Sequence, residues 1–512
     1  MDSMMTASET IGEAARPPAG LGAQAARGAF WTLLFSILNK VVALGSQIAL
    51  AWFLVPEQIG LVALALSVAN LLALMLGGNL RSVLVQRQEN FAAEAGQVFW
   101  LSLSLNTTAA LLLAALAPVA GWLFHEPRVV PLILIAAASV PILALSTIYS
   151  AALYRDLRFR SVARVIFVEG LIRNGGAVAL AALGFGASSM VLPFGAAALF
   201  SAVSCRLLTG RIPLGRPQPR RWLALLGPGA WLMAGAAVAA VQTYGTNFII
   251  GLRHESAVAG FYFWGFTFAS QAIFLLVANL QTVFFSALAR LNANLARQQE
   301  AFRQLSRALA FALAPVCVLQ AVLARPALEL LFHERWLPAV PVVQWLSLGL
   351  LTQPLNILAG ALLMARGEFR RLALLNGGVA LTVVAAAIIG AEVGTQAAIA
   401  ASTGVALLVA NLFAGWSACR EICGGTLAFF RHAVAPTLVA LPLGALAWFA
   451  ARTTAGYPPL VIILVTTLTV LLVFALGIRA FAPEFVVELL ARLRDRAAAN
   501  PAGSLPKSPS LS

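Results

Sequence analysis

Residues 129–160 of the chain read VVPLILIAAASVPILALSTIYSAALYRDLRFR. The first part, near 129–153, contains no charged residue and is long enough to cross a bilayer, which takes roughly 20 apolar residues of α-helix. It is followed at once by Arg155, Arg158 and Arg160. Because loops on the cytoplasmic side of a membrane are enriched in arginine and lysine, this pattern indicates a transmembrane helix that ends in the cytoplasm.

The same pattern recurs along the whole chain. Of the 512 residues, 61% are hydrophobic and only 10% are charged, and the mean hydropathy is +0.89. An average soluble domain has about a quarter of its residues charged. We therefore predict an all-α polytopic membrane protein with about 14 transmembrane helices. Besides 129–153, the predicted spans lie near 29–54, 59–78, 96–121, 164–184, 187–208, 224–251, 258–287, 305–331, 339–363, 371–390, 394–418, 432–451 and 458–479.

The basic residues predict the orientation of these spans. When the segments between spans are assigned alternately to two sides, one side holds 27 of the 34 lysines and arginines, and the other holds Arg128, Arg253, Arg335 and Arg452. The first side, which includes both termini, is expected to be cytoplasmic. Residues 1–28 are then a disordered cytoplasmic tail and residues 480–512 a second tail. Because topology accounts for the net charge of +15, we expect no nucleic-acid partner.

A motif that occurs twice divides the chain. Leu123-Phe124-His125-Glu126 recurs as Leu331-Phe332-His333-Glu334, each directly before an apolar span that ends in a basic loop, and a weaker match relates residues 56–60 to residues 255–260. Six spans separate the copies, so both enter the membrane in the same direction, as in parallel transporter repeats. We predict an N-lobe at 29–208 (helices 1–6), a cytoplasmic inter-lobe loop at 209–223, a C-lobe at 224–418 (helices 7–12) and two appended helices at 432–479.

Charged and polar side chains inside the spans are the candidates for a substrate path, because a charge in the membrane is costly and faces a partner or a water-filled cavity. Lys40 lies deep in the first span, and Glu169 and Arg173 lie deep in the fifth. Glu169 and Arg173 are four residues apart, so a purely structural ion pair is the alternative to a role in transport. The polar candidates, which line a cavity or simply join helices, are Asn39, Gln47, Asn70, Gln242, Tyr244, Asn247, Gln271 and Asn356.

No pattern in the chain predicts catalysis. The sequence has no phosphate-binding loop and no nucleophile–base arrangement, and its four cysteines and four histidines lack the spacing of a metal site. The loops predicted on the outer side are too short to hold an enzyme's active site. We therefore expect no enzymatic activity, no cofactor and no bound metal.

Three blocks of the sequence resemble one known family. They are Leu50–Gln86 (LAWFLVPEQIGLVALALSVANLLALMLGGNLRSVLVQ), Ala151–Gly186 (AALYRDLRFRSVARVIFVEGLIRNGGAVALAALGFG), and a block from Gly260 (GFYFWGFTFASQAIFLLVANLQTVFFSALARL) through Leu331–Ala339 (LFHERWLPA) to Gly367. In this order they resemble bacterial polysaccharide transporters, the oligosaccharide flippases of lipopolysaccharide and exopolysaccharide synthesis. That family belongs to the multidrug/oligosaccharidyl-lipid/polysaccharide exporter superfamily, and the resemblance covers spans 1–11.

The resemblance implies two six-helix lobes that work by alternating access without ATP, in the bacterial cytoplasmic (inner) membrane. It implies a polyprenyl-diphosphate-linked oligosaccharide as substrate, with membrane lipids and glycan polymerase or export machinery as further partners. A diphosphate crossing an apolar slab needs cations along its path, and Lys40, Arg173 and Arg81 are the candidates. Ion-coupled members of the superfamily are expected to use intramembrane carboxylates, which makes Glu169 the coupling candidate.

Two other functions remain as alternatives. A multidrug or cation exporter of the same superfamily would favour acidic residues in its cavity, and Lys40 and the scarcity of intramembrane carboxylates argue against it. An integral membrane glycan ligase or polymerase would normally carry a long periplasmic loop, which this sequence does not contain.

Overall fold

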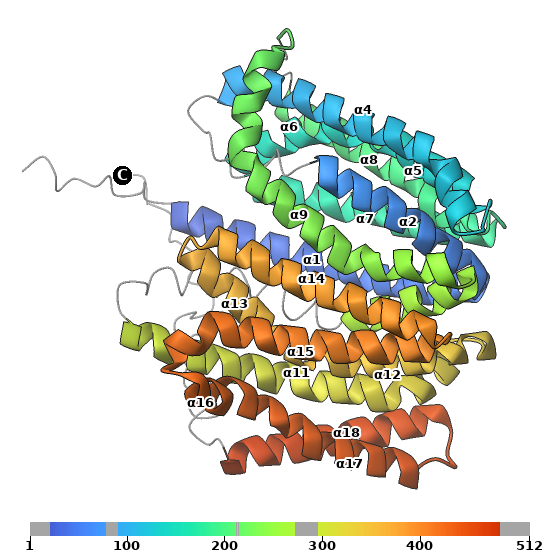
Figure 1. Ribbon diagram of the computed structural model, residues 1–512, viewed down its shortest axis with the longest axis vertical. Helices are drawn as coiled ribbons and strands as arrows, with labels where there is room; N and C mark the ends of the chain where they lie inside the picture. Colours follow the sequence, from blue (N-terminus) through green and yellow to red (C-terminus); the bar gives the residue numbers. More distant parts are fainter. Residues whose placement is uncertain are drawn as a thin grey trace, which may run out of the picture.

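The computed structural model describes residues 21–77, 91–156, 158–210, 212, 215–271 and 295–481, and helices make up almost all of this part of the chain (Figure 1). No strand occurs among the described residues. Twelve helical segments in these residues are long and apolar enough to cross a membrane. The predicted spans 224–251 and 258–287 correspond to a thirteenth long helix and to a helix described from 256 to 271. The predicted all-α, polytopic fold class is therefore confirmed.

The first half of the described chain forms α1 (Leu21–Phe53), α2 (Pro56–Gly77), α4 (Phe91–Leu123), α5 (Val129–Ser139), α6 (Ile142–Arg155), α7 (Phe159–Ala182) and α8 (Ser188–Thr209). The second half forms α9 (Pro219–Arg253), the helix 256–271, α11 (Leu295–Leu331), α12 (Val340–Gly349), α13 (Gln353–Ala365), α14 (Phe369–Glu392) and α15 (Gln396–Cys423). The last segments are α16 (Thr426–Phe429), α17 (Ala440–Thr453) and α18 (Pro459–Phe481). Short 3-10 or π turns, η2 to η5, lie at Glu334–Ala339, Leu350–Thr352, Phe430–Val434 and Ala435–Val439.

Three predicted spans are interrupted at or near a proline, and the span 432–451 starts in the turns η4 and η5, with Pro436, before α17 begins. The span 129–153 is divided into α5 and α6 at Val140-Pro141, and the span 339–363 is divided into α12 and α13 by η3, directly before Pro354. Proline has no backbone N–H to continue a helical hydrogen-bond ladder, so it marks such breaks. At the N-terminus, α1 begins at Leu21, so the predicted tail 1–28 is helical from that residue onward.

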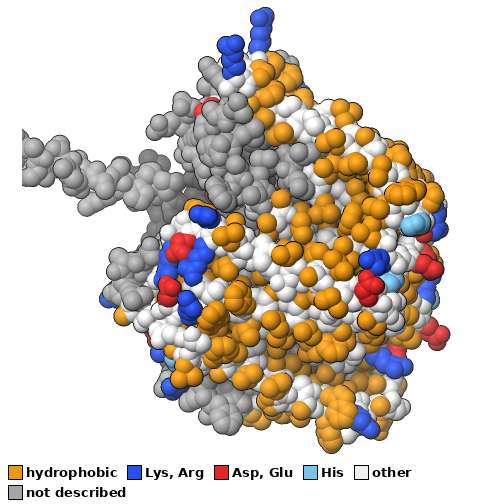
Figure 2. Space-filling model, viewed as in Figure 1, with side chains coloured by type: hydrophobic (Ala, Val, Ile, Leu, Met, Phe, Trp, Pro, Cys, Tyr) orange, Lys and Arg blue, Asp and Glu red, His pale blue; other side chains and the backbone are white. Residues whose placement is uncertain are grey.

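The charged side chains gather at the two ends of the helical bundle. Figure 2 shows a broad hydrophobic band with blue and red side chains along its margins. One end carries the basic connections around residues 156–158, 210–218, 366–368 and 424–425, and we name it the arginine-rich end. The end that carries Arg128, Arg253, Arg335 and Arg452 is named the opposite end. An apolar band between two charged margins is the surface expected of a protein solvated by lipid tails.

The helix packing repeats along the chain. Within α1 to α8, which we name the N-lobe, α1 packs along α7, α7 along α8, and α6 along α8. Within α9 to α15, the C-lobe, α9 packs along α14, α14 along α15, and α13 along α15 in the same order. In Figure 1 α17 and α18 lie beyond the C-lobe, on the side away from the N-lobe, and they pack on α11. The exact lobe boundaries stay a prediction.

The lobes share hydrophobic cores toward the opposite end and have separate cores at the arginine-rich end. Leu50, Ala51 and Leu54 of α1 are buried in one cluster with Trp264 and Trp336 of the second half. At the arginine-rich end, by contrast, one cluster consists only of N-lobe residues with Ile212 and Trp222 beside it, and another belongs to the C-lobe and α16 to η4. At the arginine-rich end the described contact between the lobes runs through α9, whose Trp222 packs against the N-lobe cluster.

Candidate functional site

The helices α1 and α7 pack against each other, and Lys40 and Arg173, two of the three charged residues predicted deep inside the spans, lie near this contact. Gly170 of α7 makes room for Asn39 of α1, because a Cβ atom at Gly170 would overlap the Asn39 side-chain oxygen. Two turns further on, the Ser46 hydroxyl donates a hydrogen bond to the Asn174 carbonyl at 3.0 Å. Both pairs advance in the same direction along the two helices, so α1 and α7 run parallel and closely packed.

Lys40 and Arg173 lie on the same side of this contact. Lys40 follows Asn39 by about 100° around α1, and Arg173 lies next to the Gly170 and Asn174 face of α7, about one helical turn away in height. For two parallel helices this geometry turns both side chains to one side of the pair. Gln47 is seven residues after Lys40 and shares its face of α1. Lys40 forms no ion pair with any described residue, and Arg173 is exposed.

Arg173 also reaches toward the C-lobe. Its guanidinium acts electrostatically on the phenol of Tyr244, a half-buried residue of α9. By helix geometry Lys40, Gln47 and Arg173 lie on one side of the α1–α7 contact in which Asn39 packs, and Tyr244 of α9 is within electrostatic range of Arg173. Their chemistry, two cations with amide and phenol groups, suits an anionic group with a polar attachment.

Glu169 forms no ion pair with Arg173 among the described residues, and their four-residue spacing had left such a pair as the alternative to a role in transport. Its side chain lines a cavity of about 180 Å³ inside the N-lobe, between α6, α7 and α8. Ser146 and Ser150 of α6 and Ser201 of α8 line the same cavity. The two residues are four apart on α7 and share a face of it, but Glu169 is among the residues that line this cavity and Arg173 is not. A carboxylate among hydroxyl oxygens is a set of hard ligands.

The remaining predicted path residues lie elsewhere. Asn70 of α2 donates to the Leu66 carbonyl of its own helix at 3.0 Å. Gln242 lines a cavity of about 200 Å³ inside the C-lobe with Gln353, which accepts a hydrogen bond from Asn411 at 2.9 Å. Asn247 of α9 is almost fully buried, whereas Gln271 and Asn356 are half-buried. Arg81 lies outside the described residues. The structure does not place these side chains with Lys40.

At the opposite end, the second copy of the repeated motif binds the last turn of α1. Arg335 donates hydrogen bonds to the carbonyls of Ala51 and Trp52, at 3.1 and 2.7 Å, and the Trp336 indole donates to the Ala51 carbonyl at 2.9 Å. In return, the Trp52 indole donates to the Leu331 carbonyl at 2.6 Å. The last carbonyls of a helix have no partner within it, so these bonds satisfy them and attach α1 to the C-lobe.

The first copy of the motif makes the corresponding contact with the last turns of α9. Phe124 packs against Gly251, where a Cβ atom would lie 2.9 Å from the ring, and its ring lies edge-on to Phe248 with centroids 5.4 Å apart. Glu126 accepts a hydrogen bond from the Ser256 hydroxyl at 3.2 Å. Each copy of the motif thus packs on the end of the first helix of the other lobe. We name these two contacts, together with the glycine crossing described next, the lobe latch.

Two glycines allow the lobes to approach at the same end. A Cβ atom at Gly60 of α2 would overlap the Ser256 carbonyl, and a Cβ atom at Gly260 would overlap the Pro56 carbonyl. Each would also come about 3 Å from the backbone nitrogen of the other glycine. The two helices therefore cross backbone to backbone, which only glycine permits.

The contacts of the lobe latch were not predicted from the sequence. The repeated motif and the weak match of residues 56–60 to 255–260 were the available signals, and both regions meet at this end of the bundle. Single-chain periodicity does not say which lobe a motif contacts, so Arg335, Trp336 and Trp52 were not identified as partners.

Comparison with known proteins identifies the family. A family model described as "Polysaccharide biosynthesis protein" matches residues 49–341, more than half of the chain. The succinoglycan biosynthesis transport protein ExoT of Rhizobium meliloti (strain 1021) is 28% identical over 330 residues, which are 62% of this chain and 66%, just under two thirds, of that protein.

Two solved structures share the fold. The lipid II flippase MurJ in an inward closed conformation matches with a TM-score of 0.74 at 14% identity, over 88% of this chain and 99% of that one. A multidrug resistance MATE family transporter in an inward-facing conformation matches with a TM-score of 0.62 at 14% identity, over 75% of this chain and 94% of that one. Both are membrane transporters by their names, and this chain shares their fold. The chain belongs to the polysaccharide biosynthesis protein family and has the fold of the multidrug/oligosaccharidyl-lipid/polysaccharide exporter superfamily.

Proposed function

We propose that this protein is a flippase that moves a polyprenyl-diphosphate-linked oligosaccharide across the bacterial cytoplasmic membrane for surface polysaccharide or exopolysaccharide synthesis. The family and the names of its relatives support this class of function. The observation that carries the proposal is the position of Lys40 and Arg173 on one side of the α1–α7 contact, with Tyr244 of the other lobe within electrostatic range of Arg173.

The substrate chemistry fits this pair of cations. An isolated anion is excluded from a hydrocarbon layer by a large desolvation cost, and it crosses only where cations and hydrogen-bond donors replace its water. Lys40 and Arg173 supply the cations for a diphosphate, and Gln47 and Tyr244 supply neutral donors for sugar hydroxyls. The apolar polyprenyl chain needs no such path, because it stays in lipid.

The proposed transport cycle is alternating access between the two lobes. The arginine-rich end is taken as the cytoplasmic side, so both termini are cytoplasmic, and the lobes have separate cores there. Cores shared by both lobes and the lobe latch close the periplasmic side. Opening to the periplasm then requires the latch to separate while the arginine-rich ends come together. Delivery of the sugar to glycan polymerase or export machinery would follow this step.

Coupling of the cycle to an ion gradient is assigned to Glu169. Its pocket, with Ser146, Ser150 and Ser201, can exchange a proton or hold a small cation without contacting the substrate cations. In proteoliposomes, Glu169→Gln is expected to abolish the dependence of flipping on a proton or sodium gradient. Unchanged rate and unchanged gradient dependence in that variant would remove the coupling role and leave the flippase proposal intact.

The decisive test is translocation of a labelled polyprenyl-diphosphate oligosaccharide by the purified protein in liposomes. We expect Lys40→Ala and Arg173→Ala to reduce the rate by at least about 30-fold, since removing one partner of a desolvated charge pair costs about 2 kcal/mol or more. Arg325→Ala is the matched control, because Arg325 is also an exposed cation of a long helix but is paired with Glu329 at 2.8 Å. Wild-type rates in the double variant would contradict the proposal.

The alternative of a multidrug or cation exporter is tested by the same liposomes. A cationic dye should not be transported, because Lys40 and Arg173 repel it. Transport of the dye that increased in the Lys40→Ala variant, without any translocation of the glycolipid by the wild type, would favour the exporter.

A further inference from the structure

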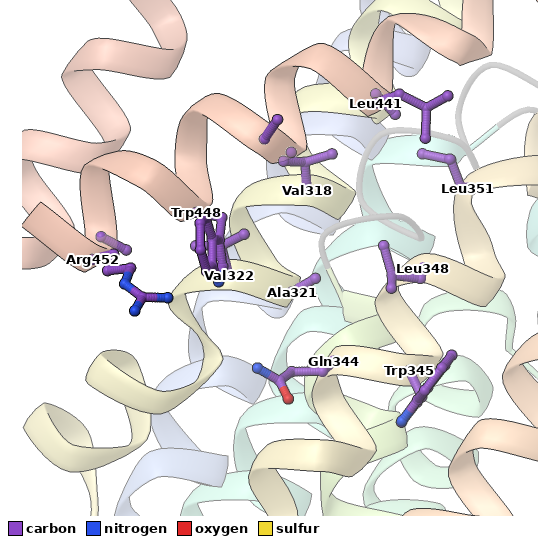
Figure 3. A pocket seen from close by; sticks show the side chains of 14 residues that line it. Val318, Ala321, Val322, Gln344, Trp345, Leu348, Leu351, Leu441, Trp448 and Arg452 are labelled. Atoms are coloured by element: carbon purple, nitrogen blue, oxygen red, sulfur yellow. The ribbon is translucent and has the colours of Figure 1, made fainter.

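A cavity of about 600 Å³ lies between α11, α12 and α17 (Figure 3), where α17 is on the side of the C-lobe away from the N-lobe (Figure 1). It is separate from the Lys40 and Arg173 path. Its walls are almost entirely apolar, and Val318, Leu348 and Leu351 are among them. The polar side chains at the cavity are Gln344 and Arg452, together with the indoles of Trp345 and Trp448.

The two faces of α17 explain why the cavity exists. Ala440, Leu443 and Ala447 pack with Val318 of α11 and Val470 of α18 in one small core. Leu441, Ala445, Trp448 and Arg452 follow one another at intervals of four, three and four residues, so they form a second face of the helix, and this face lines the cavity. Gly444 also lines the cavity, and an added Cβ atom there would still be 4.0 Å from Val318.

The cavity opens to the outside of the bundle within the apolar band. Trp448 is 55% exposed and Trp345 is 42% exposed at its edges. In a transmembrane protein such a surface faces lipid and not water. The lining of α17 from Ala440 to Arg452 extends about 18 Å at 1.5 Å per residue. Half of a bilayer's hydrocarbon core is about 15 Å thick. The cavity therefore has the length of one acyl chain in one leaflet.

The charge at its mouth indicates the headgroup. Arg452 lies in the last turn of α17, at the opposite end, with its guanidinium 5.0 Å from the centre of the Trp448 ring. No described carboxylate pairs with it. A guanidinium held over an indole at the level of the headgroups is a good partner for a phosphate, which it binds with charge-assisted hydrogen bonds.

We propose that this cavity binds an anionic glycerophospholipid of the leaflet at the opposite end, with its phosphate at Arg452 and an acyl chain along Leu348, Leu351 and Gly444. The lipid fills the space between α12 and α17, which makes α17 and α18 a lipid-binding attachment to the C-lobe. Its length fits a single leaflet, and its place behind the C-lobe keeps it off the substrate path.

The test is binding of phosphatidylglycerol to the delipidated, purified full-length protein, counted by native mass spectrometry and titrated against phosphatidylcholine. We expect one tightly held phosphatidylglycerol. Gly444→Leu, which fills the cavity, should remove it, and Arg452→Ala should weaken it about tenfold, the effect of one lost charge-assisted hydrogen bond. Arg420→Ala is the matched control, since Arg420 stacks over Trp416 at 4.9 Å in the same way but lies at the arginine-rich end.

Three results would overturn the proposal. They are retention of the lipid by Gly444→Leu with an unchanged melting temperature, equal binding of phosphatidylcholine and phosphatidylglycerol, and displacement of the phospholipid by a low concentration of polyprenyl phosphate. The last result would assign the cavity to the substrate's lipid chain. Flipping activity of Gly444→Leu, measured in parallel, separates a folding defect from loss of the lipid.

Discussion

The N-lobe and the C-lobe can be compared position by position. The helices α1 and α9 end at residues 53 and 253, and α7 and α14 both begin with Phe-Arg, at Phe159 and Phe369. In this correspondence the N-lobe residues Lys40, Glu169 and Arg173 are equivalent in position to three apolar residues of the C-lobe. These are Ala240, Val379 and Val383. All three counterparts are buried.

The two lobes therefore share the arrangement of their helices but not the charged side chains proposed for transport. Where the lobes meet at the opposite end, both copies of the repeated motif do the same task on the other lobe's first helix. Where a charged substrate would pass, the N-lobe alone supplies the two cations. In the proposed cycle the C-lobe would then be an apolar wall that moves against a charged one.

The largest expected effect comes from exchanging residues between the lobes. Val383→Arg places a cation in a position that is 3% exposed, and a charge inside a span costs roughly 2.5–3.5 kcal/mol on insertion scales. We expect this variant to be lost from the membrane fraction. Arg173→Val, the reverse exchange, should insert normally and lose glycolipid translocation by about 30-fold or more. Membrane immunoblots measure the amount of Val383→Arg in the membrane, and the liposome assay measures translocation by Arg173→Val.

The double variant Arg173→Val/Val383→Arg tests whether the cation must be in the N-lobe. Restored transport in this variant would contradict the proposed difference between the lobes, because either lobe could then carry the cation.

The next effect concerns the glycine crossing of the lobe latch. Gly60→Leu introduces a side chain into the Ser256 backbone, so the lobes must part at the opposite end. We expect a large gain in the labelling of single cysteines placed at that end, together with a loss of transport. Gly45→Ala is the control, since nothing lies within 4 Å of its Cβ position and helical alanine is favoured over glycine by roughly 0.5–1 kcal/mol. Equal labelling in both variants would mean that Gly60 does not hold the lobes together.

A smaller effect should distinguish the two motif contacts. Trp336→Phe keeps a buried ring but loses the hydrogen bond to Ala51, which is worth about 1 kcal/mol. Ser256→Ala loses a single long bond to Glu126, a carboxylate that also pairs with Arg128. Cysteine labelling at the opposite end should therefore rise several-fold in Trp336→Phe and little in Ser256→Ala. The reverse order would show that the first motif copy is the stronger contact.

The smallest effect is a gain in stability at one copy only. His125 has a φ of 54°, in the left-handed region that is unfavourable for a residue with a side chain, whereas His333 in the second copy has a φ of −74°. We expect His125→Gly to raise the free energy of unfolding by up to about 1 kcal/mol and His333→Gly to lower it. Thermal melting in detergent should show a higher melting temperature for His125→Gly and a lower one for His333→Gly. A destabilised His125→Gly would mean that the imidazole makes a contact that outweighs the backbone strain.

Much of the fold was predictable because the bilayer imposes simple requirements. A span needs an uninterrupted apolar run of fixed length, so every predicted span coincides with a helix wherever the chain is described. The breaks at Val140-Pro141 and before Pro354 were not predicted, because prolines inside transmembrane helices often only bend them. Residues such as Lys40 and Arg173 were found as candidates because charge is rare in these spans.

The site could be predicted only in part, because helix rotation depends on neighbours. The spacing of Glu169 and Arg173 left a pair open, yet no ion pair joins them among the described residues, and Glu169 lines a cavity between α6, α7 and α8. Gln242 was grouped with Lys40 but lies inside the C-lobe. The contact of Arg335 with α1 joins residues 284 positions apart, and no local pattern encodes such a distance.

The crossing of Gly60 and Gly260 has a genetic consequence. A contact on a pseudo-two-fold axis is made by equivalent residues, and in a symmetric ancestor one codon would have specified both halves of it. In this chain the two glycines are encoded separately, so each can mutate alone. A larger side chain at either position fits only if the other helix shifts. Suppressors of a damaging Gly60→Ala allele should therefore concentrate at Pro56, Ser256 and Gly260, and an inventory of natural variants should show the four positions changing together.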